Sequence, residues 1–200
     1  MKVEDFFTYY GNAIVCFGVC AIIVSFPDRS FISALLGGCL MATNYYFSHR
    51  LLHLLPGCLN FHLNIHHSSK WLPRSLELLF EGLIEFVYFM AIPLLLQSLF
   101  NDWIIPFSVI LLLSLTYTTY HIYNYSVLGS EHHSAHHKDN TKNFSPNFMD
   151  HLFETNLNEE HEDLNPGITN VIISTLIVLI LKRYFKWTDG LTWSKASNIV

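Results

Sequence analysis

The sequence predicts an all-α, multi-pass membrane protein of about four spanning helices, with a histidine-rich cap that holds a dinuclear metal site. Hydrophobic residues make up 51% of the chain and charged residues only 14%, which is too apolar for an ordinary soluble domain. The apolar residues come in long uncharged blocks, as they do in spanning helices. The 12 histidines gather in the polar segments between the blocks. We treat residues 1–200 as one domain.

The first predicted span is the uncharged block of residues 6–27, which is about long enough to cross a bilayer. The next apolar blocks are residues 30–48, 82–100 and 103–120. These runs are continuous and do not alternate in polarity, so a β-barrel is not expected. In hydrocarbon, each segment must satisfy its own backbone hydrogen bonds, which predicts that every block is a helix.

The basic residues predict the orientation. If the four blocks span, two histidine-rich segments, residues 49–74 and 131–165, lie on the same side as the N-terminus. The basic residues of that side are Lys2, Arg50, Lys70, Arg74, Lys138 and Lys142, and the other side has Arg29. The positive-inside rule places the histidines in the cytosol. We expect no cleavable secretory signal, which fits the endoplasmic reticulum membrane if the source is eukaryotic.

A last apolar stretch, residues 168–181, is shorter than the others. If it spanned, Lys182, Arg183 and Lys186 would lie outside, against the positive-inside rule. A re-entrant or interfacial helix that closes over the histidine-rich segments is therefore at least as compatible with the sequence.

Two histidine pairs follow the second block. His49 and His53 are four residues apart, and so are His62 and His66, with His67 directly after. Residues four apart share one face of a helix, so both imidazoles of a pair can reach one metal ion. In α-helical geometry His67 points roughly 100° away from His66, so that a doubled histidine can serve two ions.

Two further elements complete the pattern. His121 ends the fourth block, and His133, His136 and His137 form a compact group near it. Between His67 and His121 lie two membrane-length helices joined by a tight turn. Such a hairpin returns the chain to the face it left, so we expect all the clusters to meet at one membrane surface.

The number of imidazoles predicts two metal ions, because nine ligands exceed what one ion takes. The candidate ligands are His49, His53, His62, His66, His67, His121, His133, His136 and His137. His132 is equally compatible with a ligand and with a residue that supports one. Imidazole binds iron, copper, zinc and nickel alike. A dinuclear site beside the bilayer suits oxygen chemistry on an apolar chain, which needs a redox-active metal and excludes zinc as the working ion.

Other polar residues have ordinary interpretations. We interpret His151 and His161 as solvent-facing histidines, and Glu85 as an acid whose carboxylate reaches the membrane surface from a helix end. Glu131, next to the last histidine group, is a candidate hydrogen-bond partner of a ligand. The tyrosines near the histidines suit an aromatic belt at the interface: Tyr45, Tyr46, Tyr120, Tyr123 and Tyr125.

The histidine pattern resembles the fatty acid hydroxylase / sterol desaturase superfamily over residues 40–155. Residues 48–53 and 61–69 are similar to its paired first boxes, and residues 133–137 to its terminal His-x-x-His-His box. Residues 143–155 resemble its Asn-Tyr-Gly and Trp-Asp-Arg-Leu-Phe-Gly-Thr stretch. There are three departures: Ser145 and Glu154 replace glycines, and Tyr125 stands where many members have a second histidine after the one that matches His121.

The resemblance implies a helical membrane fold whose cytosolic cap holds two iron ions. It implies oxygen-dependent hydroxylation, desaturation or demethylation of a fatty acyl, sphingolipid or sterol-type lipid. No haem, flavin or nicotinamide motif is seen, so an external donor such as cytochrome b5 with its reductase is implied. A lipid desaturase and a non-catalytic membrane metal-binding protein remain alternatives. The net charge of -5 and the lack of a basic stripe argue against a nucleic-acid partner.

Overall fold

The computed structural model describes residues 3–57, 60–67, 73–100, 104–157, 161–162 and 164–189, and within these ranges it contains helices and loops but no strand. The predicted all-α class is confirmed. The α-helices are α1 (Val3–Ser25), α2 (Phe31–Leu54), α3 (Arg74–Phe100), α4 (Phe107–Thr119), α5 (Glu131–Lys138), α6 (Asn147–Leu152) and α7 (Gly167–Phe185), and two π-helical segments are η1 (His62–His66) and η2 (Tyr120–Val127).

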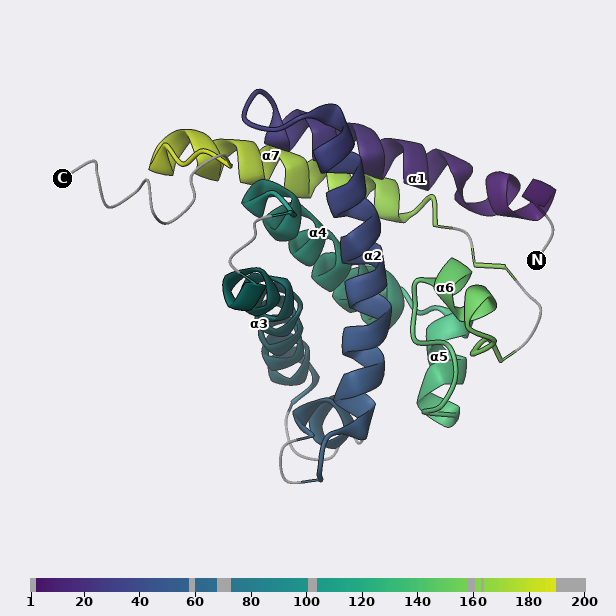
Figure 1. Cartoon of the computed structure of the whole chain (residues 1–200). Helices are drawn as coiled ribbons and strands as arrows, with labels where there is room; N and C mark the ends of the chain where they lie inside the picture. The colour runs from purple at the N-terminus through teal and green to yellow at the C-terminus, as the bar shows by residue number, and fades with distance from the viewer. Residues whose placement is uncertain are drawn as a thin grey trace.

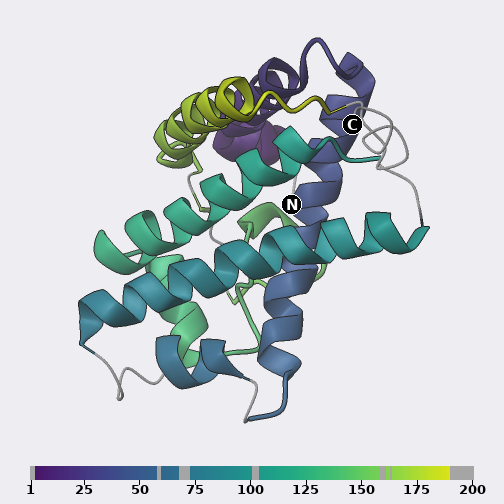
Figure 2. The ribbon, with the colours of Figure 1, turned by 90° about the vertical axis from the view of Figure 1, so that its left-hand side faces the viewer.

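Five long helices form the bundle. Helices α1 and α7 pack side by side, and α2 crosses them on its way to the histidine-rich end (Figure 1). Helices α3 and α4 pack against each other as a hairpin (Figure 2), and both also contact α2. The short helices α5 and α6 lie beside the lower half of α2 in Figure 1. The bundle thus leaves one end to the histidine-bearing segments.

Aromatic packing joins α2, α3 and α4 next to the histidines. The ring of Tyr117 stacks on Tyr45 with centroids 4.6 Å apart and meets Phe89 edge-on, also at 4.6 Å. Phe89 is fully buried, and Tyr45 and Tyr117 are nearly so. Such ring pairs stabilise a fold beyond the area that they bury. They therefore fix the relative positions of α2, which carries His49, of α3, which carries Glu85, and of α4, which continues into the segment with His121.

A polar network ties together the helix ends that lie away from the histidines. The ammonium group of Lys182 lies 2.8 Å from Asp28 Oδ2 and 2.9 Å from Asp189 Oδ2. The other oxygen of Asp189 accepts a 2.8 Å hydrogen bond from the backbone of Ser108. The side chain of Gln97 accepts a 2.5 Å bond from Ile105 N. These contacts join the ends of α1, α3, α4 and α7, so the bundle has two distinct ends.

Three helices among the described residues are long and apolar enough to cross a membrane: Glu4–Ser25, Arg74–Phe100 and Gly167–Phe185. They confirm the expected first and third blocks. The second and fourth blocks are helical, but neither is among the three. Helix α2 carries polar residues along its second half, and α4 changes to π-helical winding at Tyr120. The predicted number of four spans is therefore not confirmed. The three apolar helices nevertheless support a location of the chain in a membrane.

Helix α7 does not close over the histidines. It runs along α1 and α4, and its last turn meets the α1–α2 turn through Lys182 and Asp28. Helix α7 is one of the three described helices that are long and apolar enough to span, and whether it does so, with Lys182 and Arg183 on the outer side, stays open. The orientation itself stays a prediction, since Lys2, Lys70 and the turn at residues 101–103 lie outside the described residues. The assignment of residues 1–200 to one domain also stays a prediction.

The closest crossing of α2 and α4 predicts a difference between neighbouring glycines. A Cβ at Gly37 would lie 3.2 Å from both Ile105 and Pro106, whereas nothing lies within 4 Å of a Cβ at Gly38. We expect Gly37→Val to destabilise the fold by about 1–3 kcal/mol through overpacking. Gly38→Val, the matched control, should change the stability by about 0.5 kcal/mol or less. Thermal unfolding in detergent tests this, and equal losses would contradict the close crossing.

Candidate metal centre

The first two histidine pairs come together where α2 ends and η1 follows. Helix α2 continues through Leu54, so His49 and His53 both lie on its last turns. In η1 the backbone N–H of His67 donates to the carbonyl of His62 five residues earlier, at 3.3 Å. This wider winding places His67 Nε2 3.3 Å from His62 Nε2. A π-helical turn aligns residues five apart, so His62 is grouped with His67, whereas the α-helical expectation paired His62 with His66.

The remaining histidines come from η2 and α5. Helix α4 continues without a break into η2, whose second residue is His121. Ser130 precedes helix α5, and its hydroxyl caps the helix by accepting a hydrogen bond from the backbone of His133. One turn of this helix then presents His133 and His137, four residues apart, to the centre, with His136 beside them. The expected convergence of all four clusters is what the structure shows.

The nine predicted imidazoles form two adjoining groups of Nε2 atoms. In the first group, His49, His53, His62 and His136 offer ring nitrogens within 4.8 Å of one another, as His66, His133 and His137 do in the second. His67 joins the first group at His62, and His121 joins the second at His133, with Nε2 atoms 3.3 and 3.2 Å apart. The structure thus brings all nine together, while their role as ligands stays a prediction.

The spacing of these atoms fits coordinated metal ions. Neighbouring Nε2 atoms are 2.8–3.3 Å apart. With a metal–nitrogen distance of about 2.1 Å, ligands at 90–109° have nitrogens roughly 3.0–3.4 Å apart. Without a cation, several imidazole lone pairs aimed at one point would repel each other. The donor set therefore fits two metal ions held mainly by imidazole.

Backbone carbonyl groups fix the direction of two of the rings. His49 Nδ1 lies 2.6 Å from the carbonyl oxygen of Phe144, and His136 Nδ1 lies 2.5 Å from that of Lys142. A carbonyl only accepts hydrogen bonds, so Nδ1 carries the proton and Nε2 keeps its lone pair. Partners of this kind orient metal-binding histidines and select the tautomer that coordinates.

Two buried glutamates of α3 lie behind two rings of the second group and orient them. Glu85 Oε1 lies 2.5 Å from His121 Nδ1, and Glu81 forms a close contact with His66 Nδ1. Glu85 is 1% exposed, so the interpretation as an acid reaching the membrane surface is wrong. Glu81 was not singled out from the sequence. The available signal was the spacing of Glu77, Glu81 and Glu85 by four residues, which places three acids on one face of an apolar helix.

Burial keeps most of these imidazoles neutral. It lowers the pKa of His67 to about 2, and neighbouring imidazoles lower it further in the same direction. Burial likewise lowers the pKa of His136 and of His137 to about 4. A neutral imidazole has a free lone pair, whereas a protonated one cannot bind a cation. The centre is therefore ready to bind metal ions at neutral pH.

His132 lies outside the two groups. Its Nδ1 is 3.3 Å from the amide of Asn147, and its Nε2 is 3.7 Å from Asp150 Oδ2. The structure thus favours a supporting position over ligation. His161 contacts Tyr9 and the ring of His151, away from the centre. Glu131 is exposed at the start of α5.

The predicted tyrosine belt is wrong for the three tyrosines that are buried, which are Tyr45, Tyr46 and Tyr125. Tyr46 donates to or accepts from Thr155 at 2.8 Å, in the loop that follows α5. The ring of Tyr125 stacks on His133 with centroids 4.9 Å apart. These tyrosines were misassigned because their neighbours in the fold come from distant parts of the chain.

Asp150 organises the loop of residues 139–157, which supplies the two carbonyl groups. Its carboxylate accepts hydrogen bonds from Phe144 N, Ser145 N and the Thr155 hydroxyl, each 2.8 Å long. Ser145 and Glu154 have φ of 60° and 57°, the left-handed region that favours glycine. They are the two positions where the resembling superfamily has glycine. The left-handed conformation is thus adopted here by side chains that disfavour it.

A comparison with family models decides the classification. The fatty acid hydroxylase model matches residues 34–155, which include all nine histidines and the Asp150 loop. The chain belongs to the fatty acid hydroxylase family. This family comprises oxidoreductases, and the three apolar helices agree with a membrane enzyme of this kind. No significant match is found among curated proteins or among solved structures.

The departure at Tyr125 is compatible with the centre of a fatty acid hydroxylase family member. Its hydroxyl contacts Ser145 Oγ at 3.1 Å and donates to Glu162 at 2.7 Å, while its ring supports His133. Nine imidazoles converge without a histidine at this position. Tyr125 therefore takes a supporting role at a place where other members have a histidine.

The strained loop predicts that glycine is better than glutamate at position 154. Glu154→Gly should stabilise the protein by about 1 kcal/mol, because a left-handed conformation costs a residue with a Cβ about that much. Its side chain is exposed, and only its backbone carbonyl accepts from Lys142. Thermal unfolding in detergent measures the effect. Glu154→Ala, the control, keeps the Cβ and should give no gain; an equal gain would contradict the conformational explanation.

The glutamates predict a loss of metal affinity without a loss of fold. Glu85→Leu should weaken metal binding about 10–100-fold, because His121 loses the acceptor of its Nδ1 proton. Glu85→Gln should keep part of the affinity, since its amide oxygen can accept the same bond. Titration of the metal-stripped protein with ferrous iron measures this.

The control is Glu77→Leu, on the same face of α3. Glu77 is paired with Arg74 and has no contact with the histidines, so its replacement should leave metal affinity unchanged. Equal metal affinity of Glu85→Leu and the wild type would show that the carboxylate does not support the centre.

Proposed function

We propose that the protein is an oxygen-dependent lipid hydroxylase whose two iron ions are held by the nine converging histidines. The observation that carries this proposal is the pair of adjoining Nε2 groups in a buried pocket of a fatty acid hydroxylase family member. Imidazole ligation is compatible with iron, and oxidation of an unactivated C–H bond requires a redox metal. Membrane-length helices beside the centre favour a lipid as the substrate.

The chain's own residues prepare the site before any substrate arrives. Burial keeps most of the imidazoles neutral, and the acceptors near Nδ1 keep the rings aimed inward. The packing of Tyr45, Phe89 and Tyr117 closes the membrane side of the centre. Preorganised groups of this kind need little rearrangement during a reaction, which is how a site lowers its barrier. No side chain is proposed as a general base.

The overall reaction converts a C–H bond to C–OH. One oxygen atom of O2 enters the lipid and the other leaves as water, with two electrons and two protons taken up. The iron ions supply the reductive activation of O2 when they are bound. Because the sequence has no haem, flavin or nicotinamide motif, we propose that the electrons come from an external partner such as cytochrome b5 and its reductase.

We further propose that the centre faces the cytosol, in the endoplasmic reticulum membrane of a eukaryotic host. The basic residues near the histidines support this, since Arg50, Arg74, Lys138 and Lys142 are all on segments at that end. An interaction with nucleic acid is not proposed, because the net charge is -5.

Untargeted lipid mass spectrometry on cells that express the protein with a reductase tests the activity. We expect a lipid that gains one oxygen with the wild type, and at least about 100-fold less of it with His136→Ala. His151→Ala removes a histidine outside the centre and should leave the product unchanged.

Other products would point to the alternatives. A lipid that loses two hydrogens, with no oxygen gained, would identify a desaturase of the same family. Bound iron with no lipid change in several hosts would contradict the enzyme proposal and leave a metal-binding protein.

A further inference from the structure

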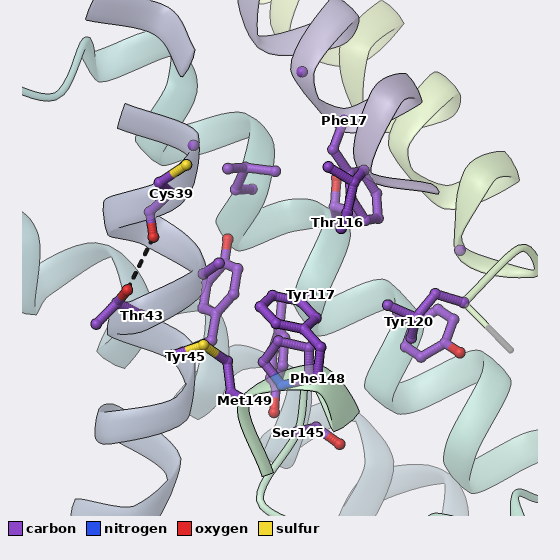
Figure 3. Close-up of a pocket in the computed structure, with 18 of the residues that line it drawn as sticks. Phe17, Cys39, Thr43, Tyr45, Thr116, Tyr117, Tyr120, Ser145, Phe148 and Met149 are labelled. Carbon is purple, nitrogen blue, oxygen red and sulfur yellow. Dashed lines mark hydrogen bonds between the residues drawn. The ribbon is translucent and has the colours of Figure 1, made fainter. Parts of the chain in front are cut away.

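A cavity of about 530 Å³ lies between α1, α2, α4, α6 and the start of α7, next to the metal centre. Figure 3 shows Cys39 and Thr43 of α2 on one side, with Tyr117, Phe148 and Met149 gathered close together. Its lining on α1 extends from Phe6 to Ala21. At 1.5 Å per residue this corresponds to about 22 Å, so the cavity is elongated.

The lining carries no charge. None of the described residues that line the cavity is an Asp, Glu, Lys, Arg or His. Both of its threonine hydroxyl groups are already bonded within the protein: Thr43 donates to Cys39 O at 3.0 Å, and Thr116 donates to Leu112 O at 2.8 Å. An ionised group placed there would lose its water and find no counter-charge, which is strongly unfavourable. The cavity therefore suits an uncharged apolar body.

One layer of tyrosine separates the cavity from the histidines. Tyr117 lines the cavity, and its hydroxyl lies 3.3 Å from His49 Nδ1. Tyr125 also lines it, and its ring stacks on His133. No member of the nine-histidine set is among the lining residues. A bound molecule would thus lie one side chain away from the proposed iron ligands.

The cavity reaches the protein surface along α2. Cys39 lines it and is exposed, and Gly38 beside it is half-buried. An added Cβ at Gly38 would meet nothing within 4 Å. A side chain at this position would therefore enter the cavity without displacing the backbone. Helix α2 thus has a small residue at the point where a molecule from the surrounding lipid can enter.

We propose that this cavity binds the apolar body of an uncharged lipid, and that Gly38 determines how large a body it admits. The identity of this lipid as the substrate rests on the proposed hydroxylase function, but its binding does not. The lipid is either a single-chain alcohol or a sterol, since both present an elongated apolar body with one neutral polar group. A free fatty acid, whose carboxylate is charged at neutral pH, is excluded from the cavity.

Photocrosslinking of the full chain in zwitterionic nanodiscs tests the proposal. Three probes carry a diazirine and an alkyne: a long-chain alcohol, a sterol and a fatty acid of the same chain length as the alcohol. We expect at least one neutral probe to label peptides that contain residues 38–45 or 113–120, and to do so at least about tenfold more than the fatty acid. The alcohol and sterol arms show which lipid body fits.

Matched variants locate the binding. Gly38→Phe should reduce the labelling about tenfold, because its ring occupies the cavity. Gly11→Phe places the same ring on α1 at a glycine that does not line the cavity, and should leave labelling unchanged. Thermal midpoints of the variants show that each is folded. His136→Ala should be labelled like the wild type, so that loss of hydroxylation and loss of binding are distinguishable.

Two results would overturn the proposal. One is labelling by the fatty acid at these peptides that equals labelling by both neutral probes. The other is a folded Gly38→Phe protein that is labelled as strongly as the wild type. Either result would show that the cavity does not select an uncharged lipid body, whatever the lipid analysis of the hydroxylase activity shows.

Discussion

The structure depends on one electrostatic constraint: nine imidazoles, six of them buried, must be aimed at two neighbouring points. Lone pairs that face each other at 2.8–3.3 Å repel unless a cation lies between them. Each ring also needs its Nδ1 proton satisfied away from water, because an unpaired buried polar group is costly. The fold meets this demand for four of the rings, with backbone carbonyls behind His49 and His136 and with carboxylates close to His66 and His121.

The supporting groups explain features that have no direct contact with a metal ion. Asp150 holds the loop whose carbonyls orient two histidines, and the loop needs left-handed residues to bring them there. Glycine is the residue that adopts this conformation with least cost. The left-handed conformation of Ser145 and Glu154 indicates that the position of the carbonyls matters more to this protein than the local backbone preference.

The membrane bundle gives the centre both its rigidity and its neighbourhood. Polar contacts tie the helix ends away from the histidines, and aromatic packing fixes α2, α3 and α4 near them. The same helices leave an uncharged cavity one tyrosine layer from the histidines. The centre lies at one end of the bundle. Its polar ligands are therefore separate from the apolar cavity, which extends along α1 and α2.

The sequence by itself determined the helical class, the family and the nine histidines, because apolar block length and i, i+4 spacing are local properties. It did not determine how His67 turns toward His62, which depends on a π-helical turn within a packed site. Nor did the sequence place Glu81 and Glu85 beside the histidines. A buried acid in an apolar helix is favourable only when a group from a distant part of the chain pairs with it. Tyr125 was misassigned, and the placement of α7 was left open, for the same reason. Contacts between distant segments decide whether a polar side chain is buried or exposed, and only the tertiary structure supplies these contacts.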